Sequence, residues 1–107
     1  MRLAAEAYRL SKLFPSDERY RVTNQLLRAA ASVPANVAEG HARGTRKDYA
    51  HFVTIARGSL AETETFILLA VEVGLVTAQH CEVAIGLVDE VGRMLNALLV
   101  KLRSPES

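Results

Sequence analysis

The chain has 107 residues and a formal net charge of +1, so it has room for one domain built around a single hydrophobic core. Half of the residues are apolar, only 6% are aromatic and alanine is abundant, a composition that favours closely packed helices over a sheet. These values exclude a second domain, and we expect one all-α domain over residues 1–107. The apolar fraction is high for so small a monomer, which predicts that another subunit covers part of the surface.

The small net charge conceals an asymmetry between the two halves of the sequence. Residues 1–57 contain ten Arg or Lys against five Asp or Glu, whereas residues 58–107 contain three against seven. Such a polarised chain can attract an anionic partner to one face. Its two halves can equally pair with each other, within the fold or between subunits.

The cysteine content and the hydropathy of the sequence indicate where in the cell the protein is located. Cys81 is the single cysteine, so it cannot form an internal disulfide, and it is interpreted as a small packing residue. Glu6 interrupts what would be the apolar core of a signal peptide, and the longest apolar run, "FILLAVEVGLV", is too short to span a bilayer. We expect a cytoplasmic protein that does not associate with membranes.

The first two helices are separated by a proline. An apolar face with helical spacing predicts a first helix over residues 2–14, and its members are Leu3, Ala7, Leu10 and Phe14. Pro15 ends this helix. Ser16 or Asp17 is a candidate cap for a second helix that begins at about residue 18.

The second helix contains Pro34 within a nearly continuous apolar run. A polar stripe with helical spacing continues in phase through the proline, and it consists of Gln25, Arg28, Ser32, Asn36 and Glu39. The constant phase predicts one kinked helix rather than two helices and a loop, with Asn36 placed to bond backbone groups that the kink loosens. The stripe fits an exposed edge, a subunit interface or the central channel of a ring.

The last two helices have clear boundary signals. Gly40 and Gly44 are interpreted as stop signals, and Thr45 as the cap of a long third helix over residues 46–74. Thr77 is the expected cap of a fourth helix, whose apolar positions alternate by four and three residues at Ala84, Val88, Val91, Leu95, Leu98 and Leu102. Four helices with short links predict an antiparallel up-and-down four-helix bundle.

No arrangement of residues indicates catalysis. The sequence lacks a phosphate-binding glycine loop, a nucleophile elbow and a histidine pair at metal-ligand spacing. Glu62 and Glu64 point to different faces of a helix, so they cannot act as a pair of carboxylates; we expect one to be exposed and the other to be partnered. We therefore predict no catalytic residues, no metal, no cofactor and no enzymatic activity.

A basic cluster at the turn between the second and third helices is a candidate for phosphate binding. Arg43, Arg46 and Lys47 would be displayed there beside a helix N-terminus, and Arg19 and Arg21 would form a separate patch at the other end of the second helix. A solvated loop is the alternative interpretation. In a ring the cluster would be repeated once per subunit, which would strengthen a weak contact.

Three segments carry a family resemblance: "ERYRVTNQLLRAAASVPANVAEGHAR", "KDYAHFVTIARGSLAETET" and "VGRMLNALL". Together they resemble the bacterial four-helix bundle family named after the protein encoded in 23S ribosomal RNA intervening sequences, and the match extends from Tyr8 to Leu102. The first helix starts about two turns late relative to the family. The resemblance implies a homopentameric barrel without known enzymatic activity. A related member of the fold, the accessory protein of diversity-generating retroelements, binds nucleic acid and its reverse transcriptase through a basic surface, which is an analogy at the level of the fold.

We therefore expect a non-enzymatic, self-assembling protein whose oligomer presents a binding surface to a macromolecule. RNA or DNA is the first expected partner, and a protein is the second. The alternative is a protein-interaction module or structural scaffold without nucleic-acid binding, in which the charge asymmetry only joins subunits.

Overall fold

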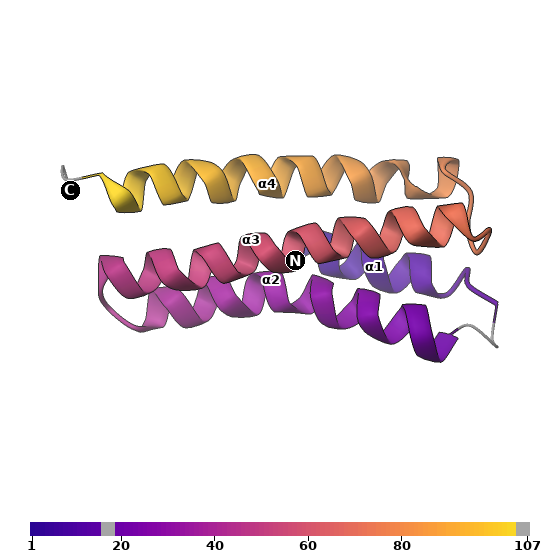
Figure 1. Ribbon diagram of the computed structural model, residues 1–107, viewed down its shortest axis with the longest axis horizontal. Helices are drawn as coiled ribbons and strands as arrows, with labels where there is room; N and C mark the ends of the chain where they lie inside the picture. Colours follow the sequence, from indigo (N-terminus) through magenta and orange to yellow (C-terminus); the bar gives the residue numbers. More distant parts are fainter. Residues whose placement is uncertain (16–18, 105–107) are drawn as a thin grey trace.

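The computed structural model describes residues 1–15 and 19–104, with side chains throughout except at Arg19 and Tyr20. Over these residues the chain is all-α and has four α-helices, as the sequence predicts (Figure 1). A π-helical turn, η2 (Arg19–Thr23), leads into the second helix, and a 3₁₀ turn, η3 (Gln79–Cys81), leads into the fourth. The helices are α1 (Arg2–Ser11), α2 (Asn24–Ala42), α3 (Arg46–Glu72) and α4 (Glu82–Arg103).

The helices run in alternating directions along one axis, and the bundle measures 49 × 22 × 18 Å (Figure 1). α3 lies between α2 and α4, and α1 packs against α2 and α4. The 10 residues of α1 extend for about 15 Å, whereas the 22 residues of α4 extend for about 33 Å. Because α1 begins near the middle of the long axis, one end of the bundle has four helices and the other has three.

The core is a single cluster of buried side chains contributed by all four helices. The predicted inward face of α1 is confirmed, since Leu3, Ala7, Leu10 and Phe14 are each at most 3% exposed. α1 nevertheless ends at Ser11 rather than Phe14, because residues 12–14 form tighter turns in which the amides of Leu13 and Phe14 bond carbonyls three residues back. Cys81 is buried, as expected of a packing residue, and burial raises the pKa of its thiol.

α2 is one continuous helix with Pro34 inside it, which confirms the prediction from the phase of its stripes. The expected caps at Ser16 and Asp17 lie outside the described residues. Gly40 is not a stop signal: it lies within α2 and is buried where this helix meets α3. Gly44 does lie in the turn, with a φ of 86° that favours glycine.

The predicted cap of α3 is confirmed, whereas Thr77 is not the N-cap of α4: this helix begins at Glu82 with Cys81 as its N-cap residue, and Thr77 bonds within the turn that precedes it. The Thr45 hydroxyl accepts a hydrogen bond from the Asp48 amide at 3.1 Å, and the Thr77 hydroxyl accepts one from the His80 amide at 3.2 Å. Gly74, with a φ of 82°, follows the end of α3. Val73 is 58% exposed, because α3 has already ended, and the chain buries Val76 instead.

Candidate nucleic-acid interface and neighbouring grooves

The predicted basic cluster lies where α2 ends and α3 begins, and Arg46 has a structural role there. Its Nη2 donates hydrogen bonds to the carbonyl oxygens of Lys101, Leu102 and Ser104, at 2.7, 3.2 and 3.0 Å. These carbonyls belong to the last turn of α4, where helix acceptors lack amide partners and the dipole favours a cation. Arg46 therefore ties the start of α3 to the end of α4.

Arg43 is also engaged within the chain. Its Nε donates to the Glu39 carboxylate at 2.8 Å, and its guanidinium lies 5.0 Å from the centre of the Phe52 ring. Both charged side chains of this pair are about half exposed. Lys47 is exposed, and within the described ranges it forms no ion pair of 4.0 Å or less. Of the three predicted residues, Lys47 is thus the one whose charged group forms no hydrogen bond or ion pair within the described residues.

The structure adds cations that the sequence analysis did not select. Lys101 and Arg103 come from the last turn of α4, and Arg103 Nη2 donates to the Thr54 hydroxyl of α3 at 3.1 Å. We call the resulting surface the basic end, and it consists of Arg43, Arg46, Lys47, Lys101 and Arg103. The sequence could have indicated these two cations, because antiparallel packing of α3 and α4 brings the end of α4 next to the turn between α2 and α3.

The separate patch of Arg19 and Arg21 lies at the opposite end of α2. Arg21 is exposed. The side chain of Arg19 lies outside the described residues. The structure therefore does not bring these two positions together with the basic end.

The polar stripe of α2 divides into a half-buried middle and exposed ends. The Ser32 and Ser59 hydroxyls lie 2.8 Å apart across α2 and α3, and Asn36 Nδ2 donates to the Ser32 hydroxyl at 2.8 Å. Asn36 Nδ2 also donates to the Ser32 carbonyl at 2.8 Å. Pro34 has no N–H group, so the carbonyl of Ala30, four residues earlier, lacks its usual amide donor. Asn36 bonds the carbonyl of Ser32 instead, which is a different backbone group from the one that the proline leaves without a donor.

The N-terminal part of the stripe borders a small polar groove. Gln25 and Arg28 are exposed there, and they line a space of about 220 Å³ together with Ser32, Ser59 and Glu62. Glu39, at the other end of the stripe, pairs with Arg43. Neither Glu62 nor Glu64 forms an ion pair of 4.0 Å or less in the part of the chain that the structure describes, so neither has an interhelix salt bridge there, and a partner in another subunit stays a prediction.

An apolar groove of about 610 Å³ lies between α2 and α4, next to the N-terminus of α1. It exists because α1 covers only part of the bundle, and Val37, Val91 and Leu98 are only partly buried along it. Pro34 also lines this groove.

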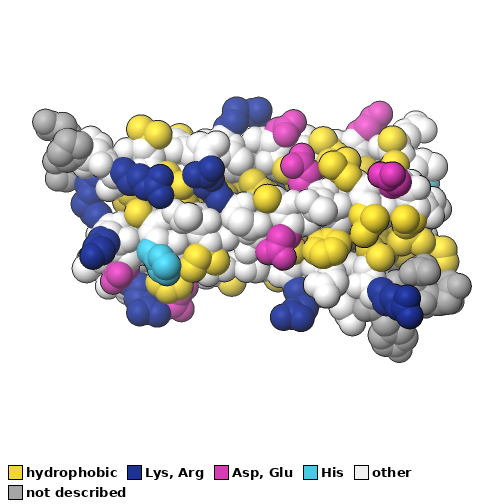
Figure 2. All heavy atoms as spheres, in the orientation of Figure 1, with side chains coloured by type: hydrophobic (Ala, Val, Ile, Leu, Met, Phe, Trp, Pro, Cys, Tyr) yellow, Lys and Arg dark blue, Asp and Glu magenta, His cyan; other side chains and the backbone are white. Residues whose placement is uncertain are grey.

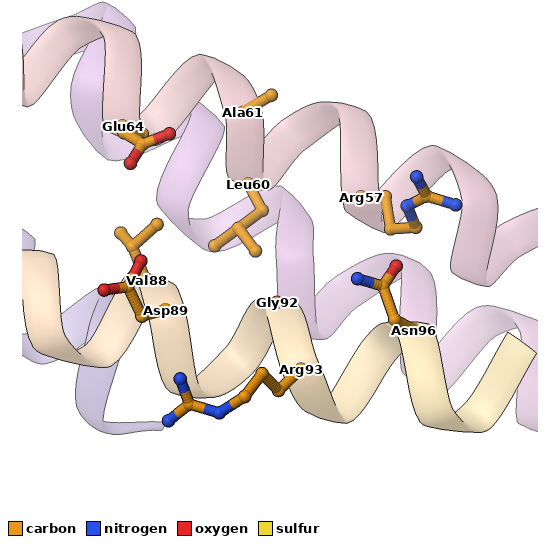
Figure 3. Close-up of a pocket in the computed structure, with 9 residues that line it drawn as sticks. All are labelled: Arg57, Leu60, Ala61, Glu64, Val88, Asp89, Gly92, Arg93 and Asn96. Atoms are coloured by element: carbon orange, nitrogen blue, oxygen red, sulfur yellow. The ribbon is translucent and has the colours of Figure 1, made fainter.

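A shallower furrow of about 360 Å³ separates α3 from α4 on the outside of the bundle (Figure 3). Glu64 and Asp89 lie toward one end and Arg57 and Asn96 toward the other, with Gly92 between them. Beyond Arg57 and Asn96, a cavity of about 530 Å³ continues to Arg103 at the basic end. We call this surface the α3/α4 furrow.

No metal centre or membrane span accompanies these surfaces. Across residues 1–15 and 19–104, no three His, Cys, Asp or Glu side chains are grouped closely enough to hold a metal ion. In the same ranges no helix is both long and apolar enough to cross a bilayer.

The fold and surfaces define a small four-helix bundle protein with a basic surface at one end. The 23S rRNA-intervening sequence protein family model matches residues 1–97, and the chain belongs to that family. The chain is also similar to a crystal structure of a protein of unknown function from the S23 ribosomal protein family of Bacteroides thetaiotaomicron VPI-5482. That similarity has a TM-score of 0.84 and 22% identity and covers 92% of each chain, which shows the shared fold. No curated protein matches the sequence.

Proposed function

We propose that this chain is a non-enzymatic, cytoplasmic protein that self-assembles and binds nucleic acid through its basic end. The observation that carries the proposal is the convergence of three helix ends, which gathers Arg43, Arg46, Lys47, Lys101 and Arg103 on one surface. Lysine and arginine side chains on an accessible surface bind phosphates without reading the base sequence. The contact is therefore sequence-independent.

Assembly would raise the affinity for nucleic acid above that of a single basic end. The resemblance to the intervening-sequence family supports a homopentameric ring, and a ring presents five basic ends to one polyanion. Exposed apolar side chains such as Tyr8, Val73 and Met94, each more than half exposed, support burial against other subunits. Native mass spectrometry of the purified protein tests the pentamer, and a monomer at micromolar concentration would reject it.

Binding is tested by fluorescence anisotropy of labelled structured RNA and duplex DNA over a salt series. Lys47→Ala/Lys101→Ala is the informative variant, because neither ammonium group takes part in a described intramolecular contact. We expect tight, salt-sensitive binding that weakens in this variant, with the slope of log affinity against log salt reduced by about 0.7–0.9 for each lost phosphate contact.

The control is Arg21→Ala, which removes a cation at the opposite end of α2. It should leave both affinity and salt slope unchanged. Equal losses in the two variants would show that binding follows net charge rather than the basic end. Absence of binding at low salt would reject the nucleic-acid proposal.

The second candidate function is a protein-interaction scaffold, and the apolar groove beside α1 favours it. This groove exposes core positions of α2 and α4, and an apolar interface of this kind responds little to salt. A partner retained at high salt, together with no binding of RNA or DNA at low salt, would select this candidate.

A further inference from the structure

The apolar groove between α2 and α4 continues the position that α1 occupies in the bundle. At one end of the bundle, α1 packs against both α2 and α4. Arg9 Nη2 donates to the His80 carbonyl at 3.2 Å, so the C-terminal part of α1 lies level with the start of α4. Toward the other end, the place beside α2 and α4 is open, and the groove lies there (Figure 1). The groove therefore extends a position that a helix already fills.

The open part of this position is about three helical turns long. α1 extends for about 15 Å beside an α4 of about 33 Å, which leaves roughly 18 Å of α4 uncovered. About 12 residues of α-helix span that length. The groove, with its volume of about 610 Å³, lies along this uncovered part.

The apolar rows of α2 and α4 continue past the start of α1, and their burial falls where α1 no longer covers them. On α2, Ala30 and Val33 are each 1% exposed, whereas Val37 is only partly buried. On α4, Ala84 is fully buried, whereas Met94 is 62% exposed. Rows of this kind, with spacings of three and four residues, are the surfaces on which helices pack. The open part of the groove thus presents a helix-packing surface.

The lining of the groove favours a helix over an extended segment. Its side chains are mostly apolar, and its polar members are Arg2, His41, Tyr49 and Glu90. Main-chain N–H and C=O groups that enter an apolar groove need hydrogen-bond partners. A helix bonds these groups internally, whereas an extended segment would leave them without partners. The occupant that suits this lining is therefore an α-helix with one apolar face.

The open end of the groove sets the direction of the occupant. α2 and α4 both end there, and the negative ends of their dipoles favour the N-terminus of a neighbouring helix. Lys101 lies seven residues after Met94, so it is on the same side of α4. Its ammonium group forms no ion pair of 4.0 Å or less within residues 1–15 and 19–104. Figure 2 shows several Lys and Arg side chains at this end of the bundle.

The inner part of the groove adds no charge preference, because Arg2 and Glu90 line it with opposite charges. Lys101 therefore decides the complementary charge. It favours a carboxylate in the first turn of the occupant, which is also where a helix dipole favours acidic residues.

We propose that the apolar groove binds an amphipathic α-helix of about three turns from a partner protein. This helix lies in line with α1 and antiparallel to α2 and α4. Its apolar face covers Val37, Val91 and Leu98, and its acidic first turn lies beside Lys101. The complex thereby has four helices along its whole length.

This inference does not require nucleic acid. It rests on the second candidate function, a protein-interaction scaffold, and states which kind of partner that scaffold binds. Its test uses a peptide and no nucleic acid. A failure of the peptide experiment therefore leaves nucleic-acid binding untouched, and a failure of nucleic-acid binding leaves the peptide experiment untouched.

The probe is a synthetic, fluorescently labelled peptide of about 14 residues, slightly longer than the open part of the groove. It has leucines on one face at spacings of three and four, aspartates in its first turn and an amidated C-terminus. A hydrocarbon staple on the polar face holds it helical, which lowers the entropy cost of binding. The control peptide has the same composition, with its leucines distributed around the helix.

Fluorescence anisotropy measures the binding of both peptides to the purified protein. We expect saturable binding of the amphipathic peptide that persists at high salt, and binding of the control that is at least about tenfold weaker. Equal binding of the two peptides, or binding of neither, would overturn the proposal.

Met94→Glu tests the groove itself by placing a charge on its apolar surface. Val100→Glu is the matched control, because Val100 is 73% exposed on the same helix but lines the cavity next to the α3/α4 furrow. Met94→Glu should weaken peptide binding at least about tenfold, or about 1.4 kcal/mol, whereas Val100→Glu should leave it unchanged. Circular dichroism confirms that both variants are folded. Equal losses in the two variants would refute the site.

Lys101→Glu tests the direction of the bound helix. It should weaken the peptide that has aspartates in its first turn, and it should not weaken a peptide that has them in its last turn. The same loss with both peptides would contradict the proposed direction.

Native mass spectrometry distinguishes a partner helix from a second copy of the chain. Both glutamate variants should keep the oligomeric state of the parent protein. Dissociation by Met94→Glu but not by Val100→Glu would show that a neighbouring subunit covers the groove, and it would overturn the proposal.

Discussion

Gly40 of α2 lies so close to Phe52 of α3 that a Cβ atom placed on the glycine would be 2.7 Å from the Phe52 Cβ. The same atom would lie 3.2 Å from the Tyr49 carbonyl oxygen. These distances are shorter than side-chain packing tolerates, and one of the atoms is backbone. The close approach of α2 and α3 at this turn therefore requires a residue without a side chain.

Gly40→Ala should destabilise the protein by about 1–3 kcal/mol through overpacking. The matched control is Gly86→Ala in α4, where an added Cβ would meet no atom within 4 Å. That control should stabilise by about 0.5–1 kcal/mol, because alanine is the better helix former. Urea unfolding of both variants measures the difference, and equal effects would contradict this account.

The Ser32 hydroxyl bonds both Ser59 and Asn36, whereas the Ser59 hydroxyl bonds the side chain of Ser32. Ser32→Ala should therefore cost more than Ser59→Ala, at about 1–3 against about 1 kcal/mol, because it removes the partner of the buried Ser59 hydroxyl and also one of the two acceptors of Asn36 Nδ2. A double-mutant cycle with chemical unfolding measures the coupling. Additive losses would show that the two hydroxyls do not interact.

Arg46 and Lys47 are adjacent cations with different expected roles. Arg46→Ala should speed hydrogen exchange in the last turn of α4, because the carbonyl oxygens of Lys101, Leu102 and Ser104 each lose a hydrogen bond from its guanidinium. Lys47→Ala should leave exchange unchanged and reduce only the binding of nucleic acid. Amide exchange measured by mass spectrometry separates the two, and identical exchange in both variants would contradict the capping role.

Glu6 gives a pH-dependent contribution to stability. The hydrogen bond from the Arg9 guanidinium lowers the pKa of the Glu6 carboxyl from its ordinary value of 4.5. This carboxyl therefore binds protons less readily in the folded state than in the unfolded state, so its contribution is complete above about pH 4.5 and is lost as the pH falls through the folded pKa.

Glu6→Gln should accordingly lower the melting temperature at neutral pH and have a smaller effect in acid. Arg9→Met removes the same interaction and should flatten the pH profile in the same way. Melting temperatures of the two variants and the parent between pH 2 and 7 provide the check. A deficit that is constant over this range would exclude the Glu6–Arg9 interaction as its cause.

Pro34 lies inside α2 and lines the apolar groove beside α1. Pro34→Ala should keep the helix content, because α2 is already continuous, but it should change the oligomer by altering the course of the helix. Circular dichroism and native mass spectrometry measure the two properties. An unchanged oligomer of unchanged stability would show that the proline has no part in assembly.

The helices and their caps could be predicted because their signals are local. Thr45 caps α3 through a hydrogen bond from an amide three residues ahead, and the spacing from Leu3 to Phe14 defines the face that α1 buries. Thr77 accepts the same kind of bond in the turn before α4, although it does not cap that helix. These relationships depend on chain geometry over a few residues. The long third helix and the continuity through Pro34 follow from the same kind of signal.

The surfaces were harder to predict because distant segments form them. The cations of the α4 C-terminus join the predicted turn only when α3 and α4 pack, and Arg46 becomes a capping residue only in that packing. Gly40 resembles a helix stop in the sequence, and only the nearby Phe52 reveals its role in packing.

The short α1 has a consequence for how the protein opens. A 10-residue helix is too short to persist alone in water, so α1 keeps its structure only while it is docked. When it undocks, Leu3, Ala7 and Leu10 leave the core together, and the seam between α2 and α4 becomes accessible along its whole length. We therefore expect α1 to be the first helix to open, and its undocked population to govern the susceptibility of the protein to proteases.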